Sequence, residues 1–310
     1  MSRTEKIVIV IPALNEEEGI AGTLKGLAGS FRNYDARVLV VDGGSSDRTV
    51  KLAKEHGANV IFQFGKGYGD ALLTGFLYGL EALAATLFVT VDADGSYVAE
   101  DLPGLVEPIL KGDADYVVGR RLIEGEAMNR LNRVGNWVIS WMTRRLLKIP
   151  VRDSQTGAFA FRSYLIGETN FRTKGWAVNT ELLKEAAEMG MAIKESDVRY
   201  RPRIGDSKLA PLSGGLANIS VILRMMRDAE PLLLFGMSAI LFTALGLLTG
   251  AGVVIEWILK GTITHVGTAI FSALSVIVGI QLLAFGLLAD MIKQGRRKSR
   301  PRSQLNYKIA

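Results

Sequence analysis

LFVTVDADGSY, residues 87–97 of this 310-residue chain, joins an apolar run of strand length to two carboxylates. Asp92 and Asp94 follow the run directly and lie one residue apart. Carboxylate oxygens are the ligands that hard cations such as Mg²⁺ and Mn²⁺ prefer. The pair therefore predicts a metal site at the end of a strand, although a helix-capping turn would have the same residues.

Other short apolar runs flank this one, and segments with helical spacing separate several of them. The apolar runs are KIVIVI (6–11), RVLVV (37–41), NVIF (59–62) and DYVVG (115–119). The helical segments include TVKLAKEHG (49–57) and DALLTGFLYGLEALA (70–84). This alternation predicts an α/β domain with a mainly parallel, Rossmann-like sheet.

Polar residues follow three of the expected strands. PALNEEE (12–18), DGGSSD (42–47) and DADGSY (92–97) would meet at the carboxyl edge of the sheet, where ligands of such sheets bind. Asp42 precedes glycines that allow a ligand to approach closely, so we assign it to a ligand. The alternative is that DGGSSD only forms a turn and caps the next helix.

Composition excludes several kinds of chemistry. The chain has no cysteine, which excludes disulfides, thiolate zinc sites and a cysteine nucleophile. Its 37 Lys and Arg exceed its 31 Asp and Glu, but residues 291–310 hold seven bases and no acid. The rest of the chain thus has 30 bases and 31 acids and no basic stripe. We therefore expect no nucleic-acid partner.

Two uncharged stretches, residues 232–255 and 266–289, predict a transmembrane hairpin, because about 20 apolar residues span a bilayer. Buried core helices are the alternative, but these seldom run so long without a charged edge. Bases flank the hairpin on both sides, whereas its connection, 256–265, holds only Lys260. An integral protein of the cell membrane with its termini and catalytic domain in the cytoplasm is expected.

Glycines within the first stretch permit close helix contact. Gly246, Gly250 and Gly252 would allow homo-oligomers to form through the hairpin, and lipid-facing glycine is equally compatible. The N-terminal residues turn acidic after a short apolar run and lack a small-residue cleavage site, so no signal peptide is expected.

Residues 128–148 predict an amphipathic helix. Its apolar stripe consists of Met128, Leu131, Val134, Val138 and Trp141. Two tryptophans and five bases favour a helix lying in the membrane interface, and packing on the sheet is the alternative. Residues 215–230 would form a second surface helix leading into the first span.

Together these motifs resemble glycosyltransferase family 2 of the GT-A fold, and within it the dolichyl-phosphate hexose synthases. The matching segments are IPALNEEEGI (11–20), DGGSSDRT (42–49), GKGYGDALLTGF (65–76), DADGSY (92–97), VGRR (118–121), RDSQTGAFAFR (152–162) and YRPRIGDSKL (200–209). The hairpin sequence is most similar to archaeal enzymes that load the first N-glycan sugar onto dolichyl phosphate. The resemblance implies a GT-A catalytic domain over residues 1–214, the hairpin over 231–290 and a basic cytoplasmic tail over 291–310.

The resemblance also implies roles for individual residues. The nucleotide sugar would be held by Pro12, Leu14, Glu16, Asp42, Lys66 and Asp92. Asp94 would be the direct ligand of Mg²⁺ or Mn²⁺, with Asp92 beside it. Mannose-transferring relatives often carry Gln two places beyond the second aspartate, where Ser96 stands here. The remaining metal ligands would then be water or diphosphate oxygens.

A lipid phosphate acceptor is already ionised near neutral pH, because the second pKa of a phosphomonoester is about 6. The reaction then needs cations rather than a strong general base. The candidate cations are Arg120, Arg121, Arg133, Arg203 and Lys208, among which motif matches favour Arg120 and Arg203. Asp153, which other members place near a catalytic base, would orient an arginine or the acceptor.

The sequence predicts inverting transfer of a hexose from a nucleotide-diphosphate sugar to dolichyl phosphate. UDP-glucose or UDP-N-acetylglucosamine is the favoured donor, and GDP-mannose is the alternative. More distant alternatives are a membrane-attached nucleotidyltransferase and a non-catalytic scaffold.

Overall fold

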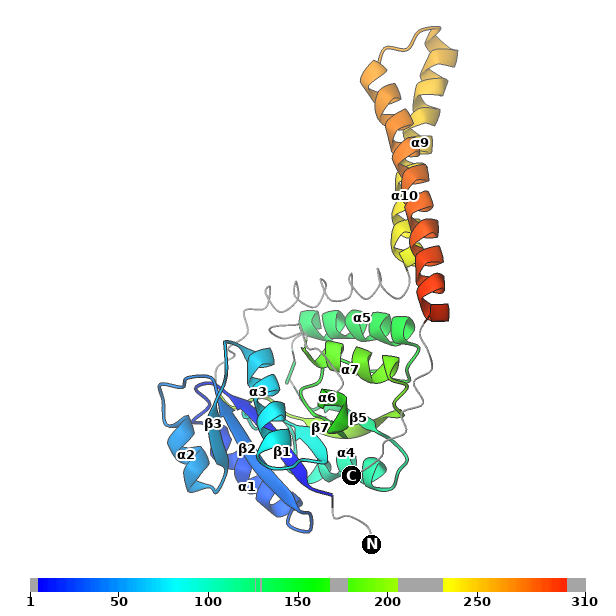
Figure 1. Cartoon of the computed structure of the whole chain (residues 1–310). Coiled ribbons are helices and arrows are strands. Elements are labelled where there is room, and N and C mark those ends of the chain that lie inside the picture. The colour runs from blue at the N-terminus through cyan, green and yellow to red at the C-terminus, as the bar shows by residue number, and fades with distance from the viewer. Residues whose placement is uncertain (1–4, 126, 129, 168–177, 206–230, 300–310) are drawn as a thin grey trace. The chain divides into compact units, whose positions relative to one another are not determined.

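The computed structural model describes residues 5–125, 127–128, 130–167, 178–205 and 231–299. Contacts divide the chain into two units, Met1–Ile222 and Leu223–Ala310. The first unit is an α/β domain and the second contains two long helices (Figure 1).

Within its described residues, the first unit contains a seven-stranded sheet with the order β3-β2-β1-β4-β6-β5-β7. The strands are β1 (Ile7–Ala13), β2 (Ala36–Asp42), β3 (Asn59–Phe62), β4 (Leu87–Thr90), β5 (Tyr116–Ile123), β6 (Phe159–Arg162) and β7 (Ile193–Tyr200). β6 runs antiparallel to β4 and β5, and the other pairings of this sheet are parallel. The expected mainly parallel sheet is confirmed.

Helices cover both faces of the sheet, as Figure 1 shows. One face carries α1 (Ile20–Ser30), α2 (Thr49–Glu55) and α4 (Pro103–Leu110), and the other carries α3 (Tyr68–Glu81), α6 (Tyr164–Gly167) and α7 (Val178–Glu188). A short 3₁₀ helix, η1 (Ala99–Asp101), precedes α4. Alternate residues of β1 enter the two cores, which explains why KIVIVI is apolar throughout.

The strand that begins at Tyr116 extends four residues beyond the expected run 115–119. β7 pairs with it in parallel from Tyr116↔Ile193 to Ile123↔Tyr200. Arg120 and Arg121 therefore lie within a strand rather than in a loop. Because successive strand residues point to opposite faces, the two guanidinium groups separate.

The expected amphipathic helix is present as α5 (Arg130–Leu147), and three residues of its apolar stripe, Val134, Val138 and Trp141, are exposed. Val134, Trp137 and Trp141 are exposed, with Trp137 at 65%. The opposite side buries two small polar residues, Ser140 and Thr143. Packing of the stripe on the sheet, the alternative considered above, does not occur for Val134, Val138 or Trp141.

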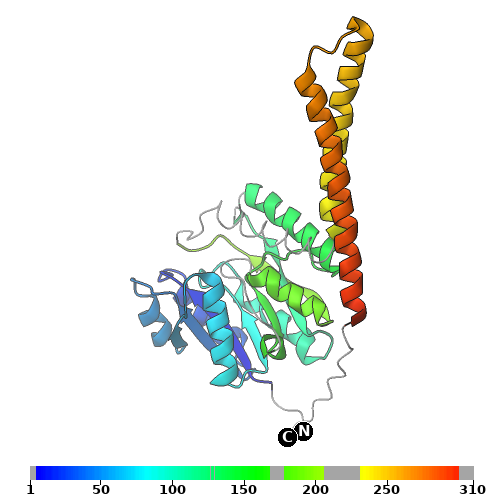
Figure 2. The same ribbon diagram turned by 45° about the horizontal axis from the view of Figure 1, so that its top comes forward.

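The second unit is a pair of helices, α9 (Pro231–Lys260) and α10 (Val266–Ser299), and Figure 2 shows them running side by side. Leu234–Lys260 and Val266–Ile292 are long and apolar enough to cross a membrane. Gly246 and Gly250 face Ser272 of α10, whose hydroxyl donates to the Gly246 carbonyl at 2.7 Å. These two glycines are thus used within the hairpin. The expected helix at 215–230 lies outside the described residues.

Candidate active site

The loop after β4 holds Asp94 in a fixed position. The carboxylate is buried and its Oδ1 accepts a hydrogen bond from the Ser96 backbone N–H at 3.0 Å. The Ile204 N–H donates to the Asp94 carbonyl at 2.9 Å. On the other side Gly19 lies so close that an added Cβ would come within 2.8 Å of the Asp94 backbone. Asp94 is therefore clamped between the start of α1 and the segment after β7.

Arg203 joins two of the predicted site residues. Its Nη2 donates to Glu16 Oε1 at 3.0 Å, and its Nη1 lies 3.7 Å from Asp94 Oδ2. Arg203 Nε is buried and has no hydrogen-bond partner within the described part of the chain. The loops after β1, β4 and β7 thus meet at one place, as expected for the carboxyl edge of the sheet.

Asp92 is half-buried beside this group. Burial, followed by the negative charge of Asp94, raises the pKa of Asp92 to about 7, against the opposite effects of Arg121 and Arg203. A divalent cation would relieve this repulsion, so the two carboxylates fit the expected Mg²⁺ or Mn²⁺. The described residues contain no group of three His, Cys, Asp or Glu placed to hold a metal. Other ligands would come from diphosphate or water.

Arg121 forms a buried ion pair with Asp153, and its charge also acts on Asp92. Its Nε and Nη2 donate to the two carboxylate oxygens at 2.7 and 2.8 Å, and the side chains are 8% and 14% exposed. The guanidinium also lies 5.5 Å from the ring centroid of Tyr200. Asp153 thus orients an arginine, which is one of the two roles expected for it.

Arg120 is placed differently. It donates from Nε and Nη2 to both oxygens of Asp197, each at 2.6 Å, in an exposed pair across β5 and β7. The sequence motifs favoured Arg120 over Arg121 for the acceptor phosphate. Of the two, it is Arg121 whose charge acts on Asp92.

The residues expected to hold a nucleoside lie around the ends of β1 and β2. The Asp42 carboxylate is buried and accepts hydrogen bonds within its own turn, from the N–H groups of Gly44 and Ser45 and from the Ser45 hydroxyl. Leu14 is exposed, and its side chain lies beside Gly43, 3.5 Å from where a Cβ on that residue would be. These hydrogen bonds fit the alternative in which DGGSSD forms a turn. Contact of Asp42 with a nucleoside stays a prediction.

The other predicted residues are less closely grouped. Pro12 is half-buried near the end of β1, and Lys66 is exposed in the glycine loop before α3. The loop is held by a hydrogen bond from the Lys66 N–H to Asp70 Oδ2 at 2.8 Å. Arg133 is exposed on α5, and Lys208 lies outside the described residues.

Two residues at the site were missed from the sequence. The Tyr97 hydroxyl accepts a hydrogen bond from the Gly157 N–H at 2.7 Å, and Gly157 lies against the Asp92 carboxylate. Tyr97 ends the DADGSY motif, and a buried tyrosine needs a partner for its hydroxyl. The need of a buried tyrosine hydroxyl for a partner was therefore the sequence signal that could have identified Tyr97.

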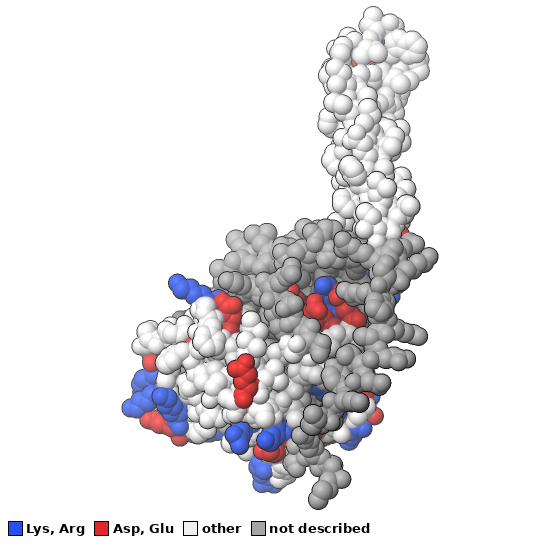
Figure 3. All heavy atoms as spheres, in the orientation of Figure 1, with Lys and Arg blue, Asp and Glu red and all other residues white. Residues whose placement is uncertain are grey.

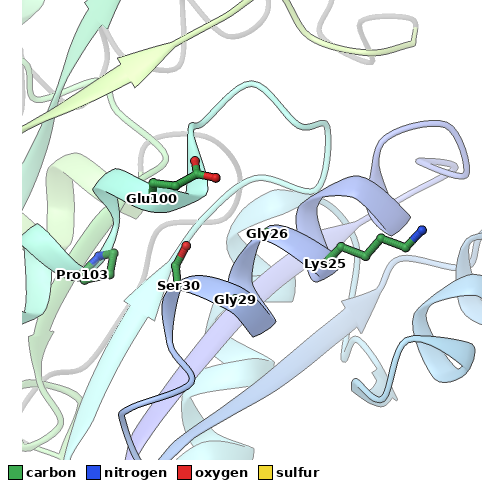
Figure 4. Close-up of a pocket in the computed structure, with 6 residues that line it drawn as sticks. All are labelled: Lys25, Gly26, Gly29, Ser30, Glu100 and Pro103. Carbon is green, nitrogen blue, oxygen red and sulfur yellow. The ribbon is translucent and has the colours of Figure 1, made fainter.

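A shallow cavity of about 330 Å³ lies elsewhere, between α1 and the segment around η1 (Figure 4). It is lined by Lys25, Gly26, Gly29, Ser30, Glu100 and Pro103. None of these is a predicted site residue, so this cavity is separate from the carboxylate edge.

The seven-stranded sheet with acidic residues at its carboxyl edge is an α/β domain of the GT-A fold. Residues 8–168 match the family described as Glycosyl transferase family 2, and because they are more than half of the chain, it belongs to this family. The chain is a glycosyltransferase, and both the family resemblance and the GT-A fold followed by two apolar helices are confirmed.

Relatives extend the similarity beyond the catalytic unit. Glycosyltransferase AglJ of Haloferax volcanii is 32% identical over 307 residues, covering 97% of this chain and 98% of the relative. A dolichyl-phosphate hexose transferase of the same organism is 36% identical and covers 69% of this chain and 90% of its own. A solved structure of glucosyl-3-phosphoglycerate synthase from Mycobacterium tuberculosis, with Mn²⁺, UDP and product, has a TM-score of 0.57 at 24% identity over 73% of this chain and 80% of that one. At that identity it shows the fold alone.

Proposed function

We propose that the protein is an inverting, metal-dependent transferase that moves a hexose from a nucleotide-diphosphate sugar to dolichyl phosphate. The observation that carries the proposal is the acidic pair Asp92 and Asp94 faced by Arg121 and Arg203, in a chain that also has two apolar helices of membrane length. Relatives named for dolichyl-phosphate sugar transfer support the acceptor. The product would serve protein N-glycosylation.

UDP-glucose or UDP-N-acetylglucosamine is the proposed donor. A relative from Methanococcus voltae, 32% identical over 62% of this chain and 84% of its own, is named as a UDP-N-acetylglucosamine–dolichyl-phosphate N-acetylglucosaminyltransferase. Ser96 supports the same choice, because its short, buried side chain replaces the Gln of mannose-transferring relatives.

The reaction requires no proton transfer. An oxygen of the acceptor phosphate forms a bond to the anomeric carbon as the bond from that carbon to the diphosphate oxygen breaks, which inverts the configuration. A divalent cation held by Asp92 and Asp94 would supply counter-charge to the leaving diphosphate. Arg203 and Arg121 would lower the repulsion between the two phosphates, and Asp153 keeps the Arg121 fork in one orientation.

The membrane would hold both the anchor and the acceptor. α9 and α10 would span it, and the outward stripe of α5 would lie in the interface with its tryptophans. Residues 1–230 and the tail at 291–310 would lie on the cytoplasmic side. If copies associate through the hairpin, Gly252 is the glycine of the three whose surroundings are open.

A panel of radiolabelled UDP- and GDP-sugars with dolichyl phosphate tests the activity. Membranes containing the protein should move label from UDP-glucose or UDP-N-acetylglucosamine into organic solvent. Transfer from GDP-mannose alone would refute the proposed donor, and transfer from no sugar would refute the function. Pyrophosphate release from a nucleoside triphosphate and a sugar phosphate would indicate a nucleotidyltransferase instead.

The absence of cysteine allows the orientation to be tested directly. Single cysteines at Lys51 and at Gly261 in sealed vesicles of known orientation should react with an impermeant maleimide from opposite sides. Labelling from the same side would refute the hairpin topology.

A further inference from the structure

The carboxylate of Asp92 packs against the backbone of Gly157. Among the described residues it accepts no hydrogen bond, unlike Asp94 and Asp153. An added Cβ on Gly157 would overlap it, coming within 2.7 Å of Oδ1 and 2.8 Å of Cγ. The carboxylate therefore lies in direct contact with the Gly157 residue.

The sheet brings Gly157 to this position. β4 and β6 are antiparallel, with Thr90 opposite Phe159, and continuing this register by two residues places Gly157 across from Asp92. The buried Thr90 hydroxyl donates to the Gly157 carbonyl at 2.8 Å. The carbonyl group of Gly157 is thereby fixed to the end of β4.

Tyr97 fixes the backbone N–H group of Gly157. Its hydroxyl accepts from the Gly157 N–H at 2.7 Å and lies 3.1 Å from Thr156 Oγ1. The ring is 7% exposed and meets the Tyr200 ring edge-on, with centroids 5.0 Å apart. Tyr97 belongs to the same loop as Asp92, so the loop fixes the glycine on which its own carboxylate rests.

We propose that Gly157 and Tyr97 are positioning residues that set the Asp92 carboxylate for binding of a cation and nucleotide. The proposal rests on the proposed function only in taking Asp92 as part of the metal and nucleotide site. Without Gly157 the carboxylate would be displaced, and without the Tyr97 hydroxyl the Gly157 peptide would be free to shift. Both residues would act through Asp92.

The test measures binding of Mn²⁺ to the full chain in detergent by calorimetry, in the presence of UDP or GDP. Gly157→Ala should weaken Mn²⁺ binding about 100-fold and Tyr97→Phe about 10-fold, the range found for residues that orient metal ligands. Gly22→Ala on α1, whose surroundings are open, and Tyr78→Phe on the exposed side of α3 are matched controls that should bind like the wild type.

A double-mutant cycle distinguishes positioning from general destabilisation. In an Asp92→Ala chain the carboxylate is gone, so adding Gly157→Ala should cost no further affinity, and the smaller side chain leaves room for the new methyl group. Equal extra losses with and without Asp92 would overturn the proposal, as would wild-type affinity in both single variants. No binding by the wild type would overturn it as well.

The outcome is separable from that of the sugar-transfer assay, because neither sugar nor lipid is present. A chain that binds Mn²⁺ and nucleotide as described but transfers no sugar to dolichyl phosphate would refute the proposed function and leave the positioning role standing.

Discussion

The two units of the chain arrange their apolar residues in opposite ways. The catalytic unit buries Ile9, Leu39 and Phe88 completely. The hairpin leaves Leu248 and Leu259 more than 70% exposed, and glycine and serine lie between its helices. Figure 3 shows the hairpin surface almost uniformly free of charge, whereas both signs occur on the catalytic unit. Water favours burial of apolar residues in a core, whereas a hairpin that spans a lipid bilayer would leave them exposed and pack on small residues instead.

The units also differ in where they keep charge. The catalytic unit brings carboxylates and guanidinium groups into its interior, around Asp92. In the hairpin, Lys260 and His265 both contact Glu256 near the end of α9. Buried charge is costly without a partner, so the charges of the catalytic unit should be the sites most sensitive to substitution.

The largest expected effect comes from breaking a buried pair. Asp153→Asn leaves Arg121 without its counter-charge, and we expect the free energy of unfolding of the catalytic unit to fall by about 3 to 5 kcal/mol. Asp197→Asn, in the exposed pair with Arg120, should cost less than about 1 kcal/mol. Urea unfolding of the full chain in detergent measures both, and equal losses would contradict the distinction between the pairs.

Asp94→Asn should greatly lower the transfer activity and leave the stability of the fold nearly unchanged. Removing one charge from the site should lower transfer of labelled sugar to dolichyl phosphate by about 100- to 1000-fold. The unfolding temperature without ligand provides the control. Unchanged transfer would remove Asp94 from the proposed metal site.

In the hairpin, glycine residues rather than aliphatic side chains lie between the two helices. Substituting such a glycine by a larger residue should therefore push the helices apart. An added Cβ on Gly279 would come within 2.9 Å of the Thr243 backbone nitrogen and 3.0 Å of the Ala239 carbonyl oxygen. We expect Gly279→Leu to destabilise the helix pair by about 1 to 3 kcal/mol. Gly252→Leu, at an open position, is the matched control. Protease sensitivity of the hairpin in mixed micelles should rise only for the first variant.

The smallest effect is expected on α5, which exposes apolar residues although it belongs to the catalytic unit. Trp137→Glu should raise the KM for dolichyl phosphate about fivefold, which corresponds to roughly 1 kcal/mol of lost apolar burial, with kcat nearly unchanged. Tyr78→Glu introduces the same charge on α3 and should leave KM as it is. Equal KM values for both variants would contradict an interfacial α5.

Periodicity in the sequence was sufficient to predict β1 to β5, α2, α3, α5 and the two long helices. It did not reveal β7, IKESDVRY, because this edge strand is rich in charge and lacks an apolar run. β6 has four residues and follows a polar loop, so its short run gave no clear strand signal. Short or edge strands depend on neighbours that are distant in sequence.

The same limit applies to the site. Asp92, Asp94, Glu16 and Arg203 come together as the motifs suggested. Adjacent arginines in VGRR could not be separated by sequence alone, because the choice depends on which partners lie on each face of β5. The register with β7 sends Arg120 to Asp197 and leaves Arg121 beside Asp153.

β6 lies between β4 and β5 although it follows both along the chain. During refolding, β1 can pair with β2 early, because the two strands are close in sequence, whereas β6 must enter between strands that come before it. Insertion of β6 also places Gly157 against the Asp92 carboxylate. We expect amide hydrogen exchange to show protection of β6 after that of β1 and β2, with affinity for Mn²⁺ appearing in the later phase. Simultaneous protection of all strands would contradict this order, in which the final step of folding also completes the proposed metal site.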